Sequence, residues 1–101
     1  MEDALVAAIE GRRAVVLAYA KDGGRGTRVC QPHILYEGST GRLLLDAVQV
    51  AGWSSSGRLP AWRIFEVDAI EHVEVLPRRF RPAADFNPGN RDRFVRVIAS
   101  V

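Results

Sequence analysis

Cysteine and long hydrophobic runs are scarce in this sequence, and both shortages restrict what the protein can be. Cys30 is the only cysteine, which excludes an intramolecular disulfide and a cysteine-based zinc site and predicts a buried structural thiol. No apolar run approaches the roughly 20 residues that cross a bilayer. Met1 is followed by Glu2 and Asp3, where a secretion signal would carry basic residues. We therefore expect a cytoplasmic protein without membrane contact.

The sequence also lacks the patterns that mark catalytic and metal-binding sites. His33 and His72 have neither a set of cysteine partners nor HExxH spacing, so no metal site is expected. Gly23, Gly24 and Gly26 are not followed by Gly-Lys-Ser or Gly-Lys-Thr, and they predict a hairpin turn rather than a phosphate loop. The serines belong to no nucleophile motif. We expect neither an enzyme nor a bound cofactor.

Lysine is nearly absent, since Lys21 is the only lysine among 14 basic residues. Residues 1–77 carry eight basic and ten acidic side chains, whereas residues 78–101 carry six arginines and two aspartates, a net charge of +4. The planar fork of arginine suits bidentate contact with phosphate or carboxylate. Genomic base composition would produce the same arginine bias, so the bias alone does not indicate a ligand.

The first two thirds of the chain read as a short helix followed by strands. Leu5, Val6 and Ile9 form an apolar stripe between a capping Asp3 and a stop at Gly11, which predicts a short N-terminal helix. Five extended segments follow at about residues 14–20, 27–36, 43–50, 62–67 and 72–77, separated by turn residues. The second segment contains Pro32, which predicts a bulge or a bend there.

The last quarter predicts an irregular connector and a closing helix. Asn90 can cap a helix in which Phe94, Val97, Ile98 and Val101 share one stripe. We thus expect a single, mainly β (α+β) domain over residues 1–101. Residues 1–77 would form the short helix and a small five-stranded bent sheet or barrel, and residues 78–101 the connector and the C-terminal helix.

Several local patterns between residues 5 and 76 recur together in one known family. They are the Ala-Ala-Ile helix end before Arg12 and Arg13, the strand that ends in Tyr19, Arg28 followed by Val29 and Pro32, and Arg-Ile-Phe-Glu-Val-Asp-Ala-Ile at residues 63–70. The last pattern is the most specific, because it resembles Arg-x-Phe-Arg-Leu-Asp-Arg-Ile. In this order the patterns are similar to the WYL domain, a ligand-sensing module of bacterial transcription regulators. The resemblance implies an Sm-like or SH3-like β-barrel.

The chain also departs from the family pattern. Leu43-Leu44-Leu45 stands where the family has the Trp-Tyr-Leu that gives it its name. Glu66 and Ala69 stand where the family commonly has arginines, which removes positive charge from the surface that it uses for ligands. No helix-turn-helix fits before Leu5, so we expect a standalone module.

The resemblance implies a sensor that binds nucleotides, single-stranded nucleic acid or other anions, and it assigns the ligand site to Tyr19, Arg28 and Arg63. An arginine beside an aromatic ring on a strand offers a phosphate fork and a stacking surface. The alternative is that Tyr19 belongs to the core and that Arg28 is a solvated edge charge.

Arg78, Arg79 and Arg81 form a second basic cluster, which would contact phosphate with Phe80 as a base-stacking ring. The alternative is a solvated connector whose Phe80 folds back onto the domain.

A function of another kind also stays open. The stripe of the closing helix and the region from Trp53 to Trp62 would suit a protein-interaction or self-assembly domain, since Trp is enriched at interfaces. The partner would then be a regulator protein or a second copy of this chain.

Overall fold

The computed structural model describes residues 1–21, 24–54 and 57–101. Gly23 of the predicted hairpin turn, and Ser55 and Ser56 of the region from Trp53 to Trp62, lie outside the described residues. The elements are, in chain order, α1 (Glu2–Gly11), β1 (Arg13–Lys21), β2 (Gly24–Glu37), β3 (Leu43–Gly52), β4 (Ala61–Glu66), the 3-10 helix η1 (Val67–Ala69), β5 (Ile70–Arg79) and β6 (Arg96–Ser100).

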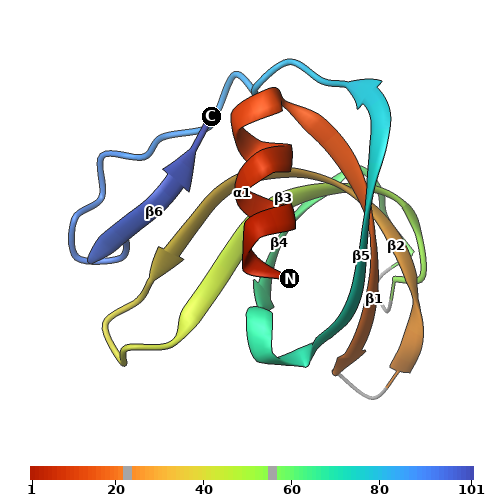
Figure 1. Ribbon diagram of the computed structural model, residues 1–101, viewed down its shortest axis with the longest axis horizontal. Helices are drawn as coiled ribbons and strands as arrows, with labels where there is room; N and C mark the ends of the chain where they lie inside the picture. Colours follow the sequence, from red (N-terminus) through yellow and green to blue (C-terminus); the bar gives the residue numbers. More distant parts are fainter. Residues whose placement is uncertain (22–23, 55–56) are drawn as a thin grey trace.

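The predicted N-terminal helix is confirmed, and it lies against one face of the curved sheet (Figure 1). Leu5, Ala8 and Ile9 are its buried residues, as the apolar stripe requires. The helix ends at Arg12, which takes a left-handed conformation with φ 52°. Its cap differs from the prediction, because the N-cap is Met1 and no side chain bonds the first turn. No helix in the described part of the chain has the length and apolar character needed to cross a membrane.

The strands form one antiparallel sheet in the order β4-β3-β2-β1-β5, and β6 pairs with β2 outside this order. β4 and β5 are the two ends of the order, yet only the three residues of η1 join them. Three residues span at most about 10 Å, so the sheet must curl to bring its ends together. The mainly β prediction is confirmed, but the sheet has six strands where five were predicted.

β2 connects the parts of the sheet because it is long enough to pair with two strands along one edge. Its first half pairs with β1, its last residues pair with β6, and its other edge pairs with β3. The register against β3 shifts between Val29 and Cys30 and again between Pro32 and Ile34. The second shift confirms the irregularity predicted at Pro32, where the missing N–H interrupts the ladder.

The prediction of a C-terminal helix is wrong. Residues 90–101 are all described and contain a turn followed by the strand β6. Asn90 Oδ1 accepts bonds of 3.2 Å from the backbone N–H groups of Asp92 and Arg93, and the chain then extends beside β2, where Val95 N–H donates to Glu37 O at 3.1 Å. β1 does not reach the last residues of β2, so the backbone groups there can hydrogen-bond another strand. The β-branched residues of this segment favour a strand at that place.

Two apolar clusters lie on opposite faces of the sheet. The larger cluster joins α1 to residues such as Leu17, Leu45 and Phe65, and the smaller contains Ile34, Tyr36 and Phe94. Cys30 belongs to the larger cluster, which confirms the buried thiol, and burial raises its pKa to about 12. Among the residues whose burial is described, four polar or charged side chains are also buried, at Arg28, His33, Asp46 and Gln49.

Candidate functional site

Arg28 is a charged residue inside the domain, with only 3% of its surface exposed. Its guanidinium carbon lies 4.8 Å from the ring centre of Tyr19, 4.8 Å from that of Trp53 and 5.6 Å from that of Phe65. Among the described residues, Nε and Nη2 of Arg28 have no hydrogen-bond partner. The aromatic faces attract the cation, but they leave two buried donor nitrogens unused.

The strands place Arg28 in the interior by register. β1 pairs Leu17 with Arg28, and directly opposed residues point to the same face, so the arginine faces the core as Leu17 does. Trp53 reaches Arg28 because two glycines make room for it. A Cβ at Gly26 would lie 2.7 Å from Cβ of Trp53, and Gly52 turns the chain with φ +94° just before Trp53.

Tyr19 is part of the core and also of this site. It is 2% exposed, and its ring meets Phe65 edge to face at 4.9 Å. Its hydroxyl accepts a 3.0 Å bond from the backbone N–H of Glu66. The tyrosine therefore fixes the end of β4 against β1, and the face of its ring is what it offers to Arg28.

Arg63 lies on the same face of the sheet as Arg28, since β4 pairs it with the buried Ala47. It is half-buried and donates through Nη2 to Ser54 Oγ at 2.9 Å and through Nη1 to Trp62 O at 3.3 Å. Arg28 and Arg63 both lower the pKa of Cys30 against the larger effect of burial. The two guanidinium groups thus act on the same interior region.

Gln49 is a member of the site that the sequence did not reveal. It is fully buried, and its Nε2 donates to Trp53 O at 2.7 Å and to Ala51 O at 3.2 Å. These bonds hold the backbone of Trp53 over Arg28. Its Oε1 has no partner among the described residues. A lone Gln in an apolar strand is the one signal that the sequence gave.

A solved structure with a similar fold belongs to PafBC. It is proteasome accessory factor B/C of Arthrobacter aurescens, with a TM-score of 0.69 and 28% sequence identity. The match covers 86% of this chain, which spans 13% of the length of that chain. No family model matches the chain, and no curated protein does.

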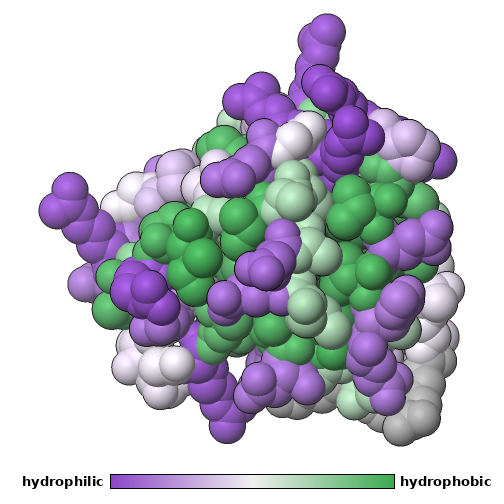
Figure 2. Space-filling model, viewed as in Figure 1, coloured by the Kyte–Doolittle hydropathy of each residue, from purple (hydrophilic) through white to green (hydrophobic). Residues whose placement is uncertain are grey.

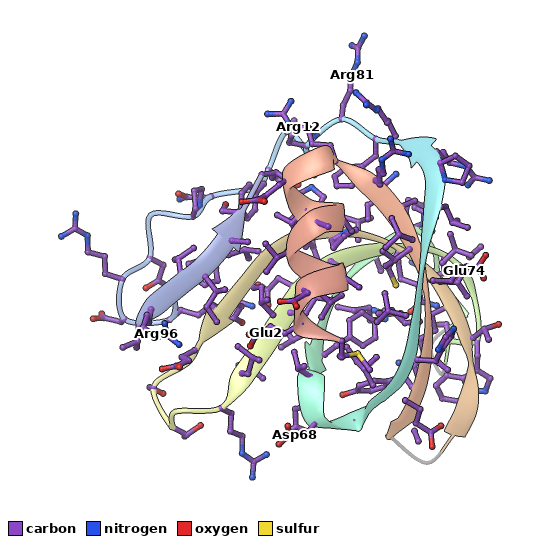
Figure 3. All side chains as sticks on the ribbon, in the orientation of Figure 1. Glu2, Arg12, Asp68, Glu74, Arg81 and Arg96 are labelled. Carbon is purple, nitrogen blue, oxygen red and sulfur yellow. The ribbon has the colours of Figure 1, made fainter. Side chains whose placement is uncertain are left out.

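The three arginines predicted as a second phosphate contact lie apart from this site. Arg78 and Arg79 end β5, and Arg81 follows; all three are exposed. Figure 3 shows Arg81 pointing outward at the end of the molecule that also carries Arg12, and Phe80 N–H donates to Arg12 O at 3.0 Å. Phe80 itself is 8% exposed and its ring centre lies 5.1 Å from that of His33, so it faces inward.

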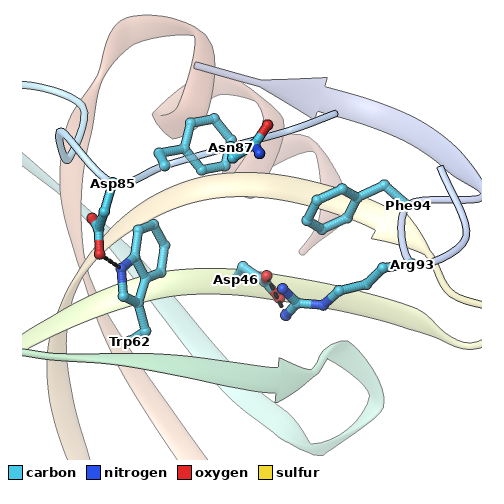
Figure 4. A pocket seen from close by; sticks show the side chains of 7 residues that line it. Asp46, Trp62, Asp85, Asn87, Arg93 and Phe94 are labelled. Atoms are coloured by element: carbon cyan, nitrogen blue, oxygen red, sulfur yellow. Dashed lines mark hydrogen bonds and ion pairs between the residues drawn. The ribbon is translucent and has the colours of Figure 1, made fainter. Parts of the chain in front are cut away.

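An open cleft of about 290 Å³ lies on the opposite face of the sheet (Figure 4). Asp46 of β3, Trp62 of β4 and Asp85, Phe86 and Arg93 of the segment between β5 and β6 line it. The sequence reasoning named only Trp62 of these, because the segment that closes the cleft was expected to be a connector and a helix. Among the described residues, no three His, Cys, Asp or Glu side chains are grouped to hold a metal ion.

Proposed function

We propose that this chain is a regulatory sensing domain of the WYL type, with an Sm-like or SH3-like barrel. Its ligand would be an anion, either a phosphate-bearing small molecule or single-stranded nucleic acid. The ligand would bind at Arg28, with Arg63 and the ring of Tyr19 beside it. Binding would stabilise one state of the domain and so report the ligand to a regulator protein.

The observation that carries the proposal is the buried guanidinium of Arg28. Moving a charge out of water costs several kcal/mol unless an opposite charge and hydrogen bonds replace the lost water. Here aromatic faces offset part of that cost, while two donors stay without a partner among the described residues. An anion would supply both the charge and the acceptors.

The likeness to PafBC supports the regulatory part of the proposal, because the name of that protein describes an accessory factor of the proteasome rather than an enzyme. The departures from the family pattern narrow the ligand site. Leu45 is buried and Leu43 and Leu44 are half-buried, so they serve packing, while Glu66 is paired with Arg42. Among the described residues, Arg28 and Arg63 are the two arginines of this face that we assign to the ligand.

The test is a thermal-shift and calorimetric titration of the whole chain with inorganic pyrophosphate and with a short oligothymidylate at low ionic strength. A ligand that binds only the folded state raises its Tm, and added salt weakens a charge-driven complex. We expect both effects with the natural sequence, and loss of binding in Arg28→Met. Arg91→Met, which removes an exposed arginine elsewhere, is the matched control and should bind as before.

The basic cluster is tested in the same titration. If Arg78, Arg79 and Arg81 contact phosphates of a longer ligand, the double variant Arg79→Met, Arg81→Met weakens the oligothymidylate and leaves pyrophosphate unchanged. If neither anion binds, or if Arg28→Met binds both as well as the natural sequence, the sensing proposal is wrong.

Self-assembly remains the second candidate function because of the apolar side chains near β6. Val95 and Val97 are 59% and 46% exposed, and Figure 2 shows apolar surface between charged side chains on this side of the molecule. β6 pairs with β2 along one edge, and among the described residues no strand covers its other edge. Strand addition there would join two copies. Sedimentation velocity would detect the dimer, which Val97→Lys should dissociate.

A further inference from the structure

The cleft on the outer face of the sheet is built from two similar units, each a carboxylate next to aromatic rings. Figure 4 shows them on opposite sides of the hollow, Asp46 with Phe94 on one side and Asp85 with Trp62 on the other. One unit holds a cation of this chain. In the other unit, none of the described residues places a cation next to the carboxylate.

The occupied unit shows what this kind of surface binds. Arg93 Nη2 lies 2.5 Å from Asp46 Oδ2, and its guanidinium carbon is 5.1 Å from the ring centre of Phe94 and 6.0 Å from that of Tyr36. The Asp46 carboxylate is nearly buried and also accepts a 2.7 Å bond from the Tyr36 hydroxyl. A planar guanidinium thus meets a carboxylate and two ring faces at once.

The second unit also joins a carboxylate to two aromatic rings, but these rings stack on each other instead of meeting edge to face, and none of the described residues puts a guanidinium there. Asp85 Oδ2 accepts a 3.0 Å bond from Trp62 Nε1, and the rings of Trp62 and Phe86 stack at 6.1 Å with an interplanar angle of 26°. His33 contacts both rings edge to face and adds no cation. Its Nε2 accepts from Ala83 N–H at 2.9 Å while its Nδ1 contacts Gln31 O at 2.8 Å, the pattern of a neutral imidazole.

The charges of the cleft favour a further cation. Its lining carries two carboxylates, Asp46 and Asp85, and one arginine, Arg93, so one negative charge is left over. We propose that Asp85, Trp62 and Phe86 form a binding site for the guanidinium group of a ligand. The group would stack on an outer face of this ring pair and donate to the Asp85 carboxylate, as Arg93 does at Asp46.

A guanidinium fits this unit better than an ammonium ion does. It is planar and weakly hydrated, so it stacks on aromatic faces and still donates in its own plane to a carboxylate. An ammonium ion is compact and strongly hydrated and gains less from the stacked rings. The same group occurs on free small molecules and on arginine side chains of a polypeptide, and the experiment separates these two sources.

The experiment follows the indole N–H signal of Trp62 by NMR in the whole chain, with Trp62→Phe used only to assign it. Ethylguanidinium is the probe, and ethylurea is its neutral match in shape. We expect a saturable shift with ethylguanidinium and none with ethylurea. Asp85→Asn should weaken binding about tenfold, since it removes the charged acceptor and keeps the side-chain shape. Asp68→Asn changes an exposed carboxylate elsewhere and should leave the titration unchanged.

The source of the guanidinium is read from a second titration with an Ala-Arg-Ala peptide blocked at both ends. Tighter binding of the peptide assigns the site to a partner polypeptide, and equal binding assigns it to a small molecule. An equal shift with ethylurea, or an unchanged shift in Asp85→Asn, would overturn the site. Arg28→Met should not affect this titration, so the outcome is independent of the anion site.

Discussion

At the scale of single residues, this domain is unusual in the charge that it encloses. Arg28 is held among three aromatic rings and lacks a carboxylate partner in the described part of the chain. Cation–π contacts contribute about 0.5–2 kcal/mol each, whereas burying an ion costs several kcal/mol. The free domain is therefore expected to be less stable than one with an apolar side chain of similar size at this position.

Arg28→Met is accordingly expected to raise the free energy of unfolding by about 1 kcal/mol, because it removes two unpartnered donors and fills a similar volume. Denaturant unfolding without added anion measures this. Arg28→Lys is the companion variant, and it should not stabilise the domain because it keeps the buried charge. A large loss of stability in Arg28→Met would mean that the ring contacts outweigh desolvation.

At the scale of elements, the end of β3 brings the site together. Gly52 closes the strand, the next residue is Trp53, and Trp53 N–H donates to Thr27 O at 3.1 Å on β2. The turn therefore joins β3 to the strand that carries Arg28. Its geometry depends on a glycine, since a Cβ at position 52 would lie 2.3 Å from Thr27 O.

Gly52→Ala is expected to destabilise the domain by about 2 kcal/mol or more, because the new methyl group meets backbone at a positive φ. Thermal or denaturant unfolding measures the loss. Gly41→Ala is the matched control, since Gly41 also has positive φ but a Cβ there would meet nothing within 4 Å. If the two variants lose the same stability, close approach to Thr27 contributes nothing beyond backbone strain.

At the scale of the whole molecule, the sheet separates two kinds of charge. Arg63 and Trp62 are neighbours on β4 and so point to opposite faces. Arg63 shares the interior face with Arg28, and Trp62 lines the acidic cleft outside. His33 packs against the rings of Trp62 and Phe86, which line this cleft, and against the ring of Phe80.

Burial of His33 in its neutral form should make the stability of the whole domain depend on pH. Desolvation lowers the pKa of His33 below its usual 6.5, although the bond to Gln31 O and the charges of Asp85 and Asp46 act in the opposite direction. The unfolded chain then binds a proton that the folded chain does not. The free energy of unfolding should therefore fall from about pH 7.5 to about pH 5.5, by at most about 1.4 kcal/mol per pH unit.

Denaturant unfolding at several pH values measures this slope. His33→Gln should flatten it, because it removes the titrating group, while His72→Gln changes an exposed histidine on β5 and should keep it. An unchanged slope in His33→Gln would assign the pH dependence to other groups.

The sequence by itself determined the features that depend on neighbours along the chain. The stripe of α1, the alternation of the strands, the irregularity at Pro32 and the buried Cys30 all follow from local periodicity and composition. The placement of Arg28 and Tyr19 in one site could also be predicted, but only from the resemblance to a family.

Only the tertiary structure decided the rest, because it depends on contacts between distant segments. The 94–101 run carries a helical stripe, yet the open edge of β2 makes residues 96–100 a strand. The same pairing brings Arg93 to Asp46, and the segment before it brings Asp85 to Trp62. Gly26, Gly52 and Gln49 bring Trp53 to Arg28 from three positions along the chain. No local sequence pattern predicts these contacts, because they are determined by packing between distant segments and not by spacing along the chain.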